Sequence, residues 1–268
     1  IGANFNKVLE KITFETSQPD KVAVENQVIK IKDETFNGIV DISAKINLGT
    51  QVKDTIKIRC VGNGVEVSNF LDLYTATTKM QDKAIVLQGD IVEDFGKKAD
   101  GSDFYTESTV LKIDSTYNTK FYENQGLGKP QVKTLLQFKN NVYGNGYIIN
   151  ADNVAGTDGT GNPKGLFAGG PLNLVALGDL ASVKAQDNIC FAVFGGVTLN
   201  NVVLKGCDLL PKDGMINLND LNYAGTVVEV LGDKVNIEYC RISHGRTVLR
   251  AFGDVNDADK VININIVN

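Results

Sequence analysis

The chain has no tryptophan, a single histidine, two methionines and five prolines among its 268 residues. One histidine without an identifiable acid and nucleophile does not define a serine–histidine–aspartate hydrolase. There is no phosphate-binding loop, and the two Gly-Asn-Gly sequences lack the strand–helix context of a dinucleotide site. The uncharged run of residues 165–178 is too short and too rich in glycine to cross a bilayer. We therefore expect neither these enzyme classes nor a membrane span.

An excess of basic residues is also missing. The chain carries 32 acidic and 27 basic residues, which gives a net charge of −5 at pH 7. A general nucleic-acid binder needs a basic face, so we expect no nucleic-acid partner. The first residues, Ile1-Gly2-Ala3, contain neither an initiator methionine nor the hydrophobic core of a signal peptide. From this we expect a mature processed protein or a part of a longer one.

The four cysteines form neither a Cys-x-x-Cys pair nor a set with metal-ligand spacing; they are Cys60, Cys190, Cys207 and Cys240. Two disulfides would allow three pairings, which the sequence does not distinguish. Free cysteine is among the most buried residue types, and we expect these side chains to act as small apolar core residues. No metal site is predicted from them.

Glycine is abundant, with 27 residues, and it combines with frequent Asn and with short runs of Val and Ile. Glycine and asparagine tolerate the left-handed conformation of tight turns, so this composition favours short strands joined by turns. The runs of alternating apolar residues predict strands at 28–32, 39–46, 55–60, 84–92, 109–113, 134–138 and 147–150. The predicted fold class is all-β. Helical spacing is found at residues 4–12, and residues 71–80 are ambiguous.

An internal repeat is the strongest signal in the sequence. The first seven residues from Thr226 and from Thr247 align at a spacing of 21, each as Thr-Val-apolar-charged-apolar-apolar-Gly. A third copy begins at Ile189, and residues 135–151 resemble an earlier one. A second short strand follows each copy, beginning at Val197, Val235 and Val261. Repeats of this size cannot bury an apolar face alone, so they are expected to stack into a continuous core.

The strand pattern apolar-x-apolar-x-Asn-apolar-x-apolar-x-Gly, together with NVYGNGYIINA at residues 141–151, resembles the right-handed parallel β-helices of the pectin-lyase-like superfamily. The resemblance covers residues 130–268 well and residues 54–130 weakly, and it concerns architecture. It implies a parallel β-helix over residues 54–268 and leaves residues 1–53 as an N-terminal cap or small β region. Because the last strand, residues 261–268, is apolar and uncapped, we expect further chain or a partner to cover it.

The first candidate site is a basic corner around residues 233–250. If Val235 and Ile237 point inward, strand alternation and a corner near Tyr239 turn the following basic residues outward. These candidate ligand-binding residues are Arg241, His244, Arg246 and Arg250. Guanidinium groups pair with carboxylates, and β-elimination of a uronate polysaccharide needs such a cation and a base. The alternative is a solvated basic corner.

Catalytic residues of the superfamily are not recognisable in this chain. Polygalacturonase-type hydrolases carry adjacent aspartates and a Gly-His-Gly element, whereas this chain has Ser-His-Gly-Arg at residues 243–246 and no two adjacent aspartates. The row of acidic residues used by calcium-dependent pectate lyases is also not found at the repeat spacing. Catalysis is therefore left open and no catalytic residue is assigned.

Two further candidates lie in loops. Tyr117 and Tyr122, within the polar and aromatic segment 114–126, are candidate sugar-stacking residues, with core or corner packing as the alternative. Acidic Gly/Asn-rich loops at 100–103, 150–162 and 254–259 can supply oxygen ligands for Ca²⁺, but none has the EF-hand spacing. We expect ordinary solvated turns and no cofactor, with Ca²⁺ as the alternative.

Three functions follow from the architecture. The favoured one is a secreted or surface-displayed bacterial protein that binds a polysaccharide or surface glycan, without catalysis in this portion. The second is a polysaccharide lyase or glycoside hydrolase, and the third is a structural part of a fibre or adhesin. All three place the protein outside the cell or on its surface.

Overall fold

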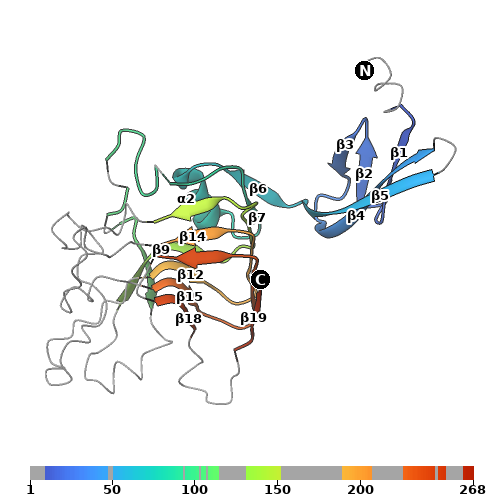
Figure 1. Ribbon diagram of the computed structural model, residues 1–268. Coiled ribbons are helices and arrows are strands. Elements are labelled where there is room, and N and C mark those ends of the chain that lie inside the picture. Colours follow the sequence, from blue (N-terminus) through green and yellow to red (C-terminus); the bar gives the residue numbers. More distant parts are fainter. Residues whose placement is uncertain are drawn as a thin grey trace, which may run out of the picture. The chain divides into compact units, whose positions relative to one another are not determined.

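The computed structural model describes residues 10–47, 51–92, 94–102, 104–106, 108–114, 131–151, 189–206, 226–244, 247–251 and 262–268. The chain divides into two compact units, Ile1–Gly64 and Val65–Asn268 (Figure 1). The boundary expected between residues 53 and 54 falls inside a strand, β5 (Gln51–Val61), which pairs with β4 (Asn37–Asn47) over its whole length. The hydrogen bonds of this long hairpin keep β5 in the first unit.

The first unit is a small antiparallel β structure. β1 (Ile12–Thr16), β4 and β5 form a sheet in the order β1-β4-β5, and β2 (Val22–Glu25) pairs with β3 (Val28–Ile31). Asn26 and Gln27 both have positive φ, as a two-residue hairpin loop requires. The small core consists of Val22, Val40, Ile42 and Cys60. In the described part of the predicted N-terminal helix, Glu10 and Lys11 form a turn and Ile12 begins β1, so that prediction is wrong there.

The second unit begins with β6 (Gly64–Val67) and helix α2 (Phe70–Lys79). Asn69 caps the helix, because its side chain accepts the N–H of Asp72 at 3.0 Å. The cap resolves the ambiguity of residues 71–80 in favour of a helix. Its buried residues include Phe70, Leu73 and Ala76, which belong to the core of this unit, and α2 packs against β9.

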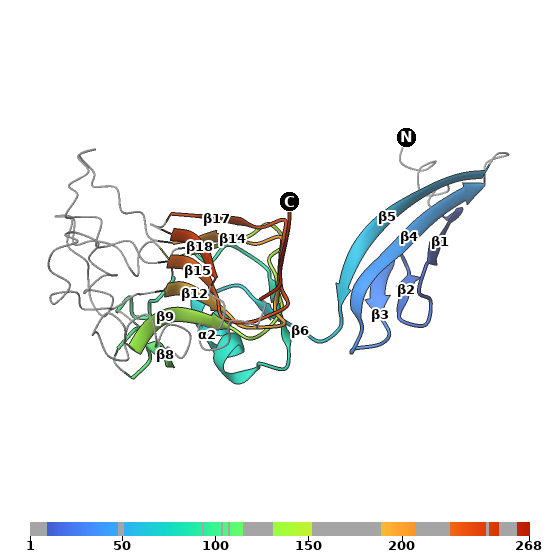
Figure 2. The same ribbon diagram turned by 90° about the horizontal axis from the view of Figure 1, so that it is seen from below.

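The strands of the second unit form three sheets (Figures 1 and 2), and buried side chains from all three belong to one core. The strand orders are β19-β16-β13-β10-β7-β6, β11-β14-β17 and β18-β15-β12-β9-β8. Strand pairing is parallel from β7 to β19, and β8 pairs antiparallel with β9. The strands are β7 (Ala84–Leu87), β8 (Leu111–Asp114), β9 (Gln131–Phe138), β10 (Val142–Tyr143), β11 (Ile148–Asn150), β12 (Ile189–Val193), β13 (Thr198–Asn200), β14 (Val203–Lys205), β15 (Thr226–Val230), β16 (Val235–Glu238), β17 (Arg241–Ser243), β18 (Thr247–Ala251) and β19 (Ile264–Val267).

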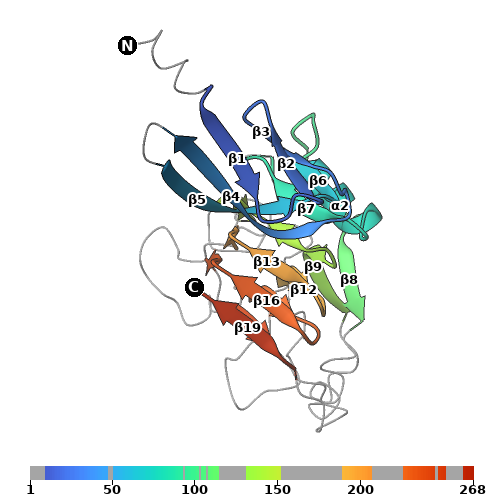
Figure 3. The same cartoon turned by 90° about the vertical axis from the view of Figure 1, so that its right-hand side faces the viewer.

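The register of these sheets confirms the repeat alignment. Thr226 pairs with Thr247, and Ile189 pairs with Thr226. In the second strand of each repeat, Leu199 of β13 pairs with Ile237 of β16. The predicted earlier repeat consists of β9, β10 and β11, which pair with β12, β13 and β14. Figure 3 shows β13, β16 and β19 side by side in one sheet. The described part of the chain is therefore all-β apart from α2, and the strands from β7 to β19 pair in parallel except for β8 with β9.

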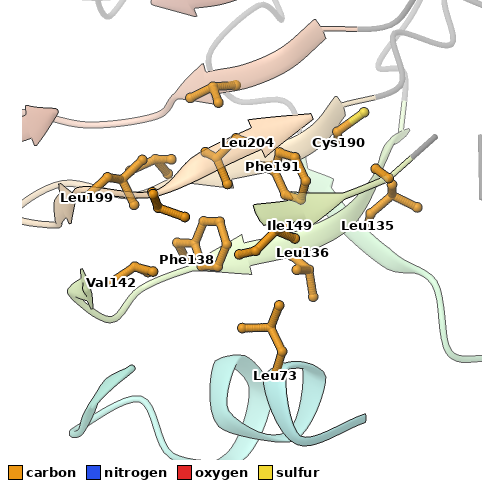
Figure 4. Close-up of a cluster of buried hydrophobic side chains, with 14 of the residues drawn as sticks. Leu73, Leu135, Leu136, Phe138, Val142, Ile149, Cys190, Phe191, Leu199 and Leu204 are labelled. Carbon is orange, nitrogen blue, oxygen red and sulfur yellow. The ribbon is translucent and has the colours of Figure 1, made fainter. Parts of the chain in front are cut away.

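The core is built by apolar residues that stack at the same position of successive repeats. Leu136, Phe191 and Val228 occupy one position of three successive strands and are fully buried. The rings of Phe138 and Phe191 stack, with centroids 6.0 Å apart and planes inclined by 20°. Figure 4 shows these side chains together with Leu73 of α2 in one apolar cluster. Burial of an apolar side chain contributes about 1.5–3 kcal/mol, so the repeated apolar positions stabilise the stack at each step.

Candidate functional site

The outward-facing side chains at the corner between β16 and β17 form the candidate site. Val235 and Ile237 are buried, whereas the alternating Asn236 and Glu238 remain partly accessible, as predicted from strand alternation. The chain turns at Tyr239, and Arg241 at the start of β17 is exposed. A carboxylate, an aromatic ring and a guanidinium group thus lie within four consecutive residues. We call residues 238–241 the β16–β17 corner.

Tyr239 has an unusual backbone for a large side chain. Its φ is +54°, and its side chain is exposed, with a residue exposure of 59%. The backbone is held in place from the next strand, because the Tyr239 N–H donates to Val267 O at 2.7 Å. A bulky L-residue at positive φ costs about 1–3 kcal/mol, and such strain concentrates at functional sites. An exposed ring offers little packing in the fold to offset this cost.

The two preceding repeats have different residues at the position of Tyr239. Asn201, which precedes Tyr239 by one repeat, has φ +49°, and asparagine adopts this conformation more readily than tyrosine. One repeat earlier the position is Gly144, where an added Cβ would lie 2.4 Å from Val202 Cα. Tyrosine at the third corner therefore has no backbone advantage over its counterparts.

A polar side-chain ladder crosses the outer face of β13, β16 and β19. Asn200 donates to Glu238 Oε2 at 2.8 Å. In the neighbouring row, Asn236 donates to Thr198 Oγ1 and Asn265 donates to Asn236 Oδ1, both at 3.3 Å. The ladder fixes amide and carboxylate groups beside the β16–β17 corner. Such an array can donate and accept hydrogen bonds at fixed positions.

Within this corner, the side chain of Cys240 packs against the core. Its thiol is close to Leu199 O at 3.4 Å and to Glu238 O at 3.3 Å, and burial raises the pKa of the thiol. The protonated thiol donates to these carbonyls, which makes it a structural group of the corner. The three described cysteines, Cys60, Cys190 and Cys240, are free thiols, and Cys207 lies outside the described residues.

Arg250 is held in an ion pair, whereas Arg241 is exposed. Arg250 lies on β18 opposite Glu229 of β15, whose exposure is 3%, and its Nε donates to Glu229 Oε2 at 2.8 Å. The Nη2 atom of Arg250 contacts the same oxygen. This ion pair connects two neighbouring strands, β15 and β18.

His244 follows the last residue of β17 and has a left-handed backbone, with φ +64°. Its Nδ1 lies 2.8 Å from Ser243 Oγ, and its side chain is partly buried. The backbone oxygen of His244 lies at the preceding corner, where a Cβ on Gly206 would approach it to 2.5 Å. Arg246, Tyr117 and Tyr122 lie outside the described residues, so of the six predicted residues only Arg241, His244 and Arg250 are placed.

The aromatic residues that the structure describes in the loops are mostly packed. Tyr105 is buried, its hydroxyl donates to Leu135 O at 2.8 Å, and its ring packs against Phe70 with centroids 5.6 Å apart. Phe104 joins this cluster through Tyr74, at 4.7 Å between centroids. Phe104 and Tyr105 are therefore packed against the core and are not exposed sugar-stacking rings.

The acidic turn at 100–102 is satisfied internally. Asp100 Oδ1 accepts the N–H of Ser102 at 3.0 Å and its hydroxyl at 2.6 Å, and these bonds lower the pKa of Asp100. Across the described ranges, no group of three His, Cys, Asp or Glu side chains is placed to hold a metal ion. The loops at 152–162 and 254–259 lie outside those ranges.

Sequence reasoning placed the corner and the direction of Arg241 but overlooked Tyr239 and the ladder residues Thr198, Asn200 and Asn265. The repeat alignment carried a signal for Tyr239, because it sets a tyrosine against the asparagine of the preceding repeat. Comparison with protein-family models, with curated proteins and with solved structures gave no match. None of the helices in the described ranges is long and apolar enough to cross a membrane.

Proposed function

We propose that the chain is a secreted or surface-displayed protein with a right-handed parallel β-helix, resembling the pectin-lyase-like superfamily, that binds a polysaccharide without catalysis in this portion. The observation that carries the proposal is Tyr239, an exposed ring kept in a strained backbone at the edge of a fixed polar ladder. The register of the repeats supports the β-helix, because each of the three sheets is extended by one strand per repeat.

The chemistry of the β16–β17 corner suits a sugar. An exposed aromatic face can stack on the apolar face of a pyranose ring, and neighbouring amides and carboxylates can bond its hydroxyl groups. Glu238, which precedes Tyr239 in the chain, and Asn200, which bonds to Glu238 from β13, supply such groups. Arg241 adds a guanidinium that pairs with the carboxylate of an acidic sugar.

Binding to a panel of immobilised neutral and acidic polysaccharides tests this proposal. We expect the wild-type chain to bind at least one polysaccharide, and Tyr239→Asn to weaken that binding by about tenfold or more, since stacking of this kind is worth on the order of 1–2 kcal/mol. Leu71→Asn is the matched control, because Leu71 is also a large exposed side chain but lies on α2. Absence of binding across the panel would overturn the proposal.

Analysis of the products of the same incubations distinguishes a binding protein from an enzyme. Formation of unsaturated products or new reducing ends, lost in Arg241→Ala, would identify a polysaccharide lyase or glycoside hydrolase instead. Binding without product supports a non-catalytic role.

A structural role in a fibre or adhesin is the second candidate, and one observation favours it. Ile266 is 61% exposed on β19, the edge strand of the six-stranded sheet. An exposed apolar edge strand is a template for pairing with another chain. Concentration-dependent association that Ile266→Lys abolishes would support this role, and a monomer at all concentrations would exclude it.

A further inference from the structure

The open edge of β5 in the first unit is independent of the glycan proposal. β5 is 11 residues long and ends the three-stranded sheet, and among the described residues no strand pairs with its other edge. Val52 and Ile56 are 59% and 55% exposed. Proteins usually shorten, bulge or cover such edges, because an exposed strand pairs readily with another.

The backbone directions along β5 follow from two hydrogen bonds. Gly62 N–H donates to Phe36 O at 2.7 Å, which sets the even-numbered residues of β5 toward β4. Thr55 N–H instead donates to the side chain of Asp54 at 2.8 Å, away from β4. The odd-numbered residues from Lys53 to Arg59 therefore direct their backbone N–H and C=O groups to the open edge.

The two faces of β5 differ sharply in chemistry. The odd-numbered side chains include Lys53, Lys57 and Arg59, all exposed. The even-numbered side chains include Val52, Ile56 and Ile58, on the same face of the sheet as Phe14 of β1, which is also exposed. A strand added at this edge would meet basic side chains on one face and, on the other, apolar side chains together with the carboxylate of Asp54.

Two ways of pairing β5 with a second copy of itself bring like charges together. In an antiparallel pair centred on Ile56, Lys53 would lie opposite Arg59, and in a parallel pair each lysine would lie beside its own copy. Like charges opposite each other destabilise a strand pair. The charge pattern disfavours these two pairings, whereas a partner of opposite charge matches the basic side chains of β5.

We propose that the open edge of β5 binds, by strand addition, an extended segment of another protein in which acidic and apolar residues alternate. The acidic side chains lie beside Lys53 and Lys57, and the apolar side chains cover Val52 and Ile56. Backbone hydrogen bonds to the odd-numbered residues provide the pairing, and the alternation provides the specificity. The bond from Thr55 N–H to Asp54 is exchanged for one to the incoming strand.

Fluorescence anisotropy of a capped, labelled peptide of alternating Glu and Val, titrated with the full chain, tests this interface. A peptide of the same composition with Glu and Val in two blocks is the control. We expect the alternating peptide to bind at least about tenfold more tightly, and the double variant Lys53→Glu/Lys57→Glu to lose about tenfold and to gain binding of an alternating Lys and Val peptide.

Thr55→Pro removes the edge N–H without removing a backbone bond to β4, and edge strands accept proline. It also removes the hydroxyl of Thr55, whose Oγ1 lies 2.9 Å from Ser43 Oγ of β4, and the control Thr55→Val removes the same hydroxyl. Thr55→Pro should lower affinity about tenfold, whereas Thr55→Val, which keeps the N–H, should bind as the wild type does. If Thr55→Pro does not fold, the exchange of peptide preference by the charge-reversed variant decides. The proposal is overturned if the alternating peptide fails to bind below about 1 mM, if both peptides bind equally, or if the wild type self-associates through this edge instead.

Discussion

Asn201 and Tyr239 occupy the same corner of successive repeats, and both have left-handed backbones, with φ of 49° and 54°. The backbone geometry is thus the same in these two repeats, while the side chain changes from a residue that suits it to one that does not. A repeat architecture makes such a comparison possible inside one molecule, because each repeat serves as the reference for the next.

Replacing Tyr239 with Asn should therefore stabilise the protein by about 1 kcal/mol, because asparagine tolerates the left-handed region and the exposed ring loses little packing. Asn201→Tyr should destabilise it by a similar amount. Urea unfolding measured for both variants checks this reciprocity. A loss of stability in Tyr239→Asn would mean that the ring serves the fold and would remove the main support for a binding role.

The Glu229–Arg250 pair should be costly to break from one side. Arg250→Leu leaves a buried carboxylate without its guanidinium and should destabilise the protein by about 3 kcal/mol. The double variant Glu229→Leu/Arg250→Leu should recover most of this loss, since two apolar residues leave no buried charge. A double-mutant cycle from equilibrium unfolding measures the coupling. Equal losses for the single and double variants would argue against a coupled pair.

Gly144→Ala should destabilise the protein by about 3 kcal/mol, because the new Cβ would lie 2.4 Å from Val202 Cα and 2.5 Å from Asn201 O, and neither backbone can yield easily. Gly89→Ala is the matched control, since nothing lies within 4 Å of its Cβ position, and it should be nearly neutral. Thermal unfolding of the two variants provides the comparison. Similar melting temperatures would show that the corner can open to admit a side chain.

The first unit should lose stability in acid through Asp33. Hydrogen bonds from Lys21 and Thr35 lower the pKa of its carboxyl from 3.8 to about 2. Because the folded-state pKa is depressed, the stabilisation is fully present above about pH 4 and is lost as pH falls toward 2. Asp33→Asn should remove this part of the pH dependence, as measured by denaturant unfolding between pH 2 and 5 at about one-unit steps. An unchanged pH profile would contradict the assignment.

Much of the second unit was predictable because parallel strands in register require the same apolar pattern in each repeat. The spacing of 21 between Thr226 and Thr247 is the actual strand register, and the inward direction of Val235 and Ile237 followed from alternation. The alignment also set Glu229 against Arg250, but the sequence analysis treated Arg250 as an outward-facing ligand-binding residue and did not predict the ion pair that the structure shows.

The boundary between the two units was harder to predict from the sequence, because an alternating strand has the same pattern whether it ends one unit or begins the next. Only the pairing of β4 with β5 assigns residues 54–61 to the first unit. Helix α2 was ambiguous for a similar reason: its apolar residues fit either period, and the Asn69 cap and the packing of Leu73 on the core decide between them.

The sequence by itself determined the strand-rich composition, the repeat and its register, since these depend on local alternation and on similarity between segments of the same chain. The tertiary structure alone decided that Tyr239 is exposed at positive φ, that Arg250 is held by Glu229, and that β5 leaves an edge open. Backbone strain, burial of charge and unpaired strand edges depend on what surrounds a residue in space, and the order of residues does not record those surroundings.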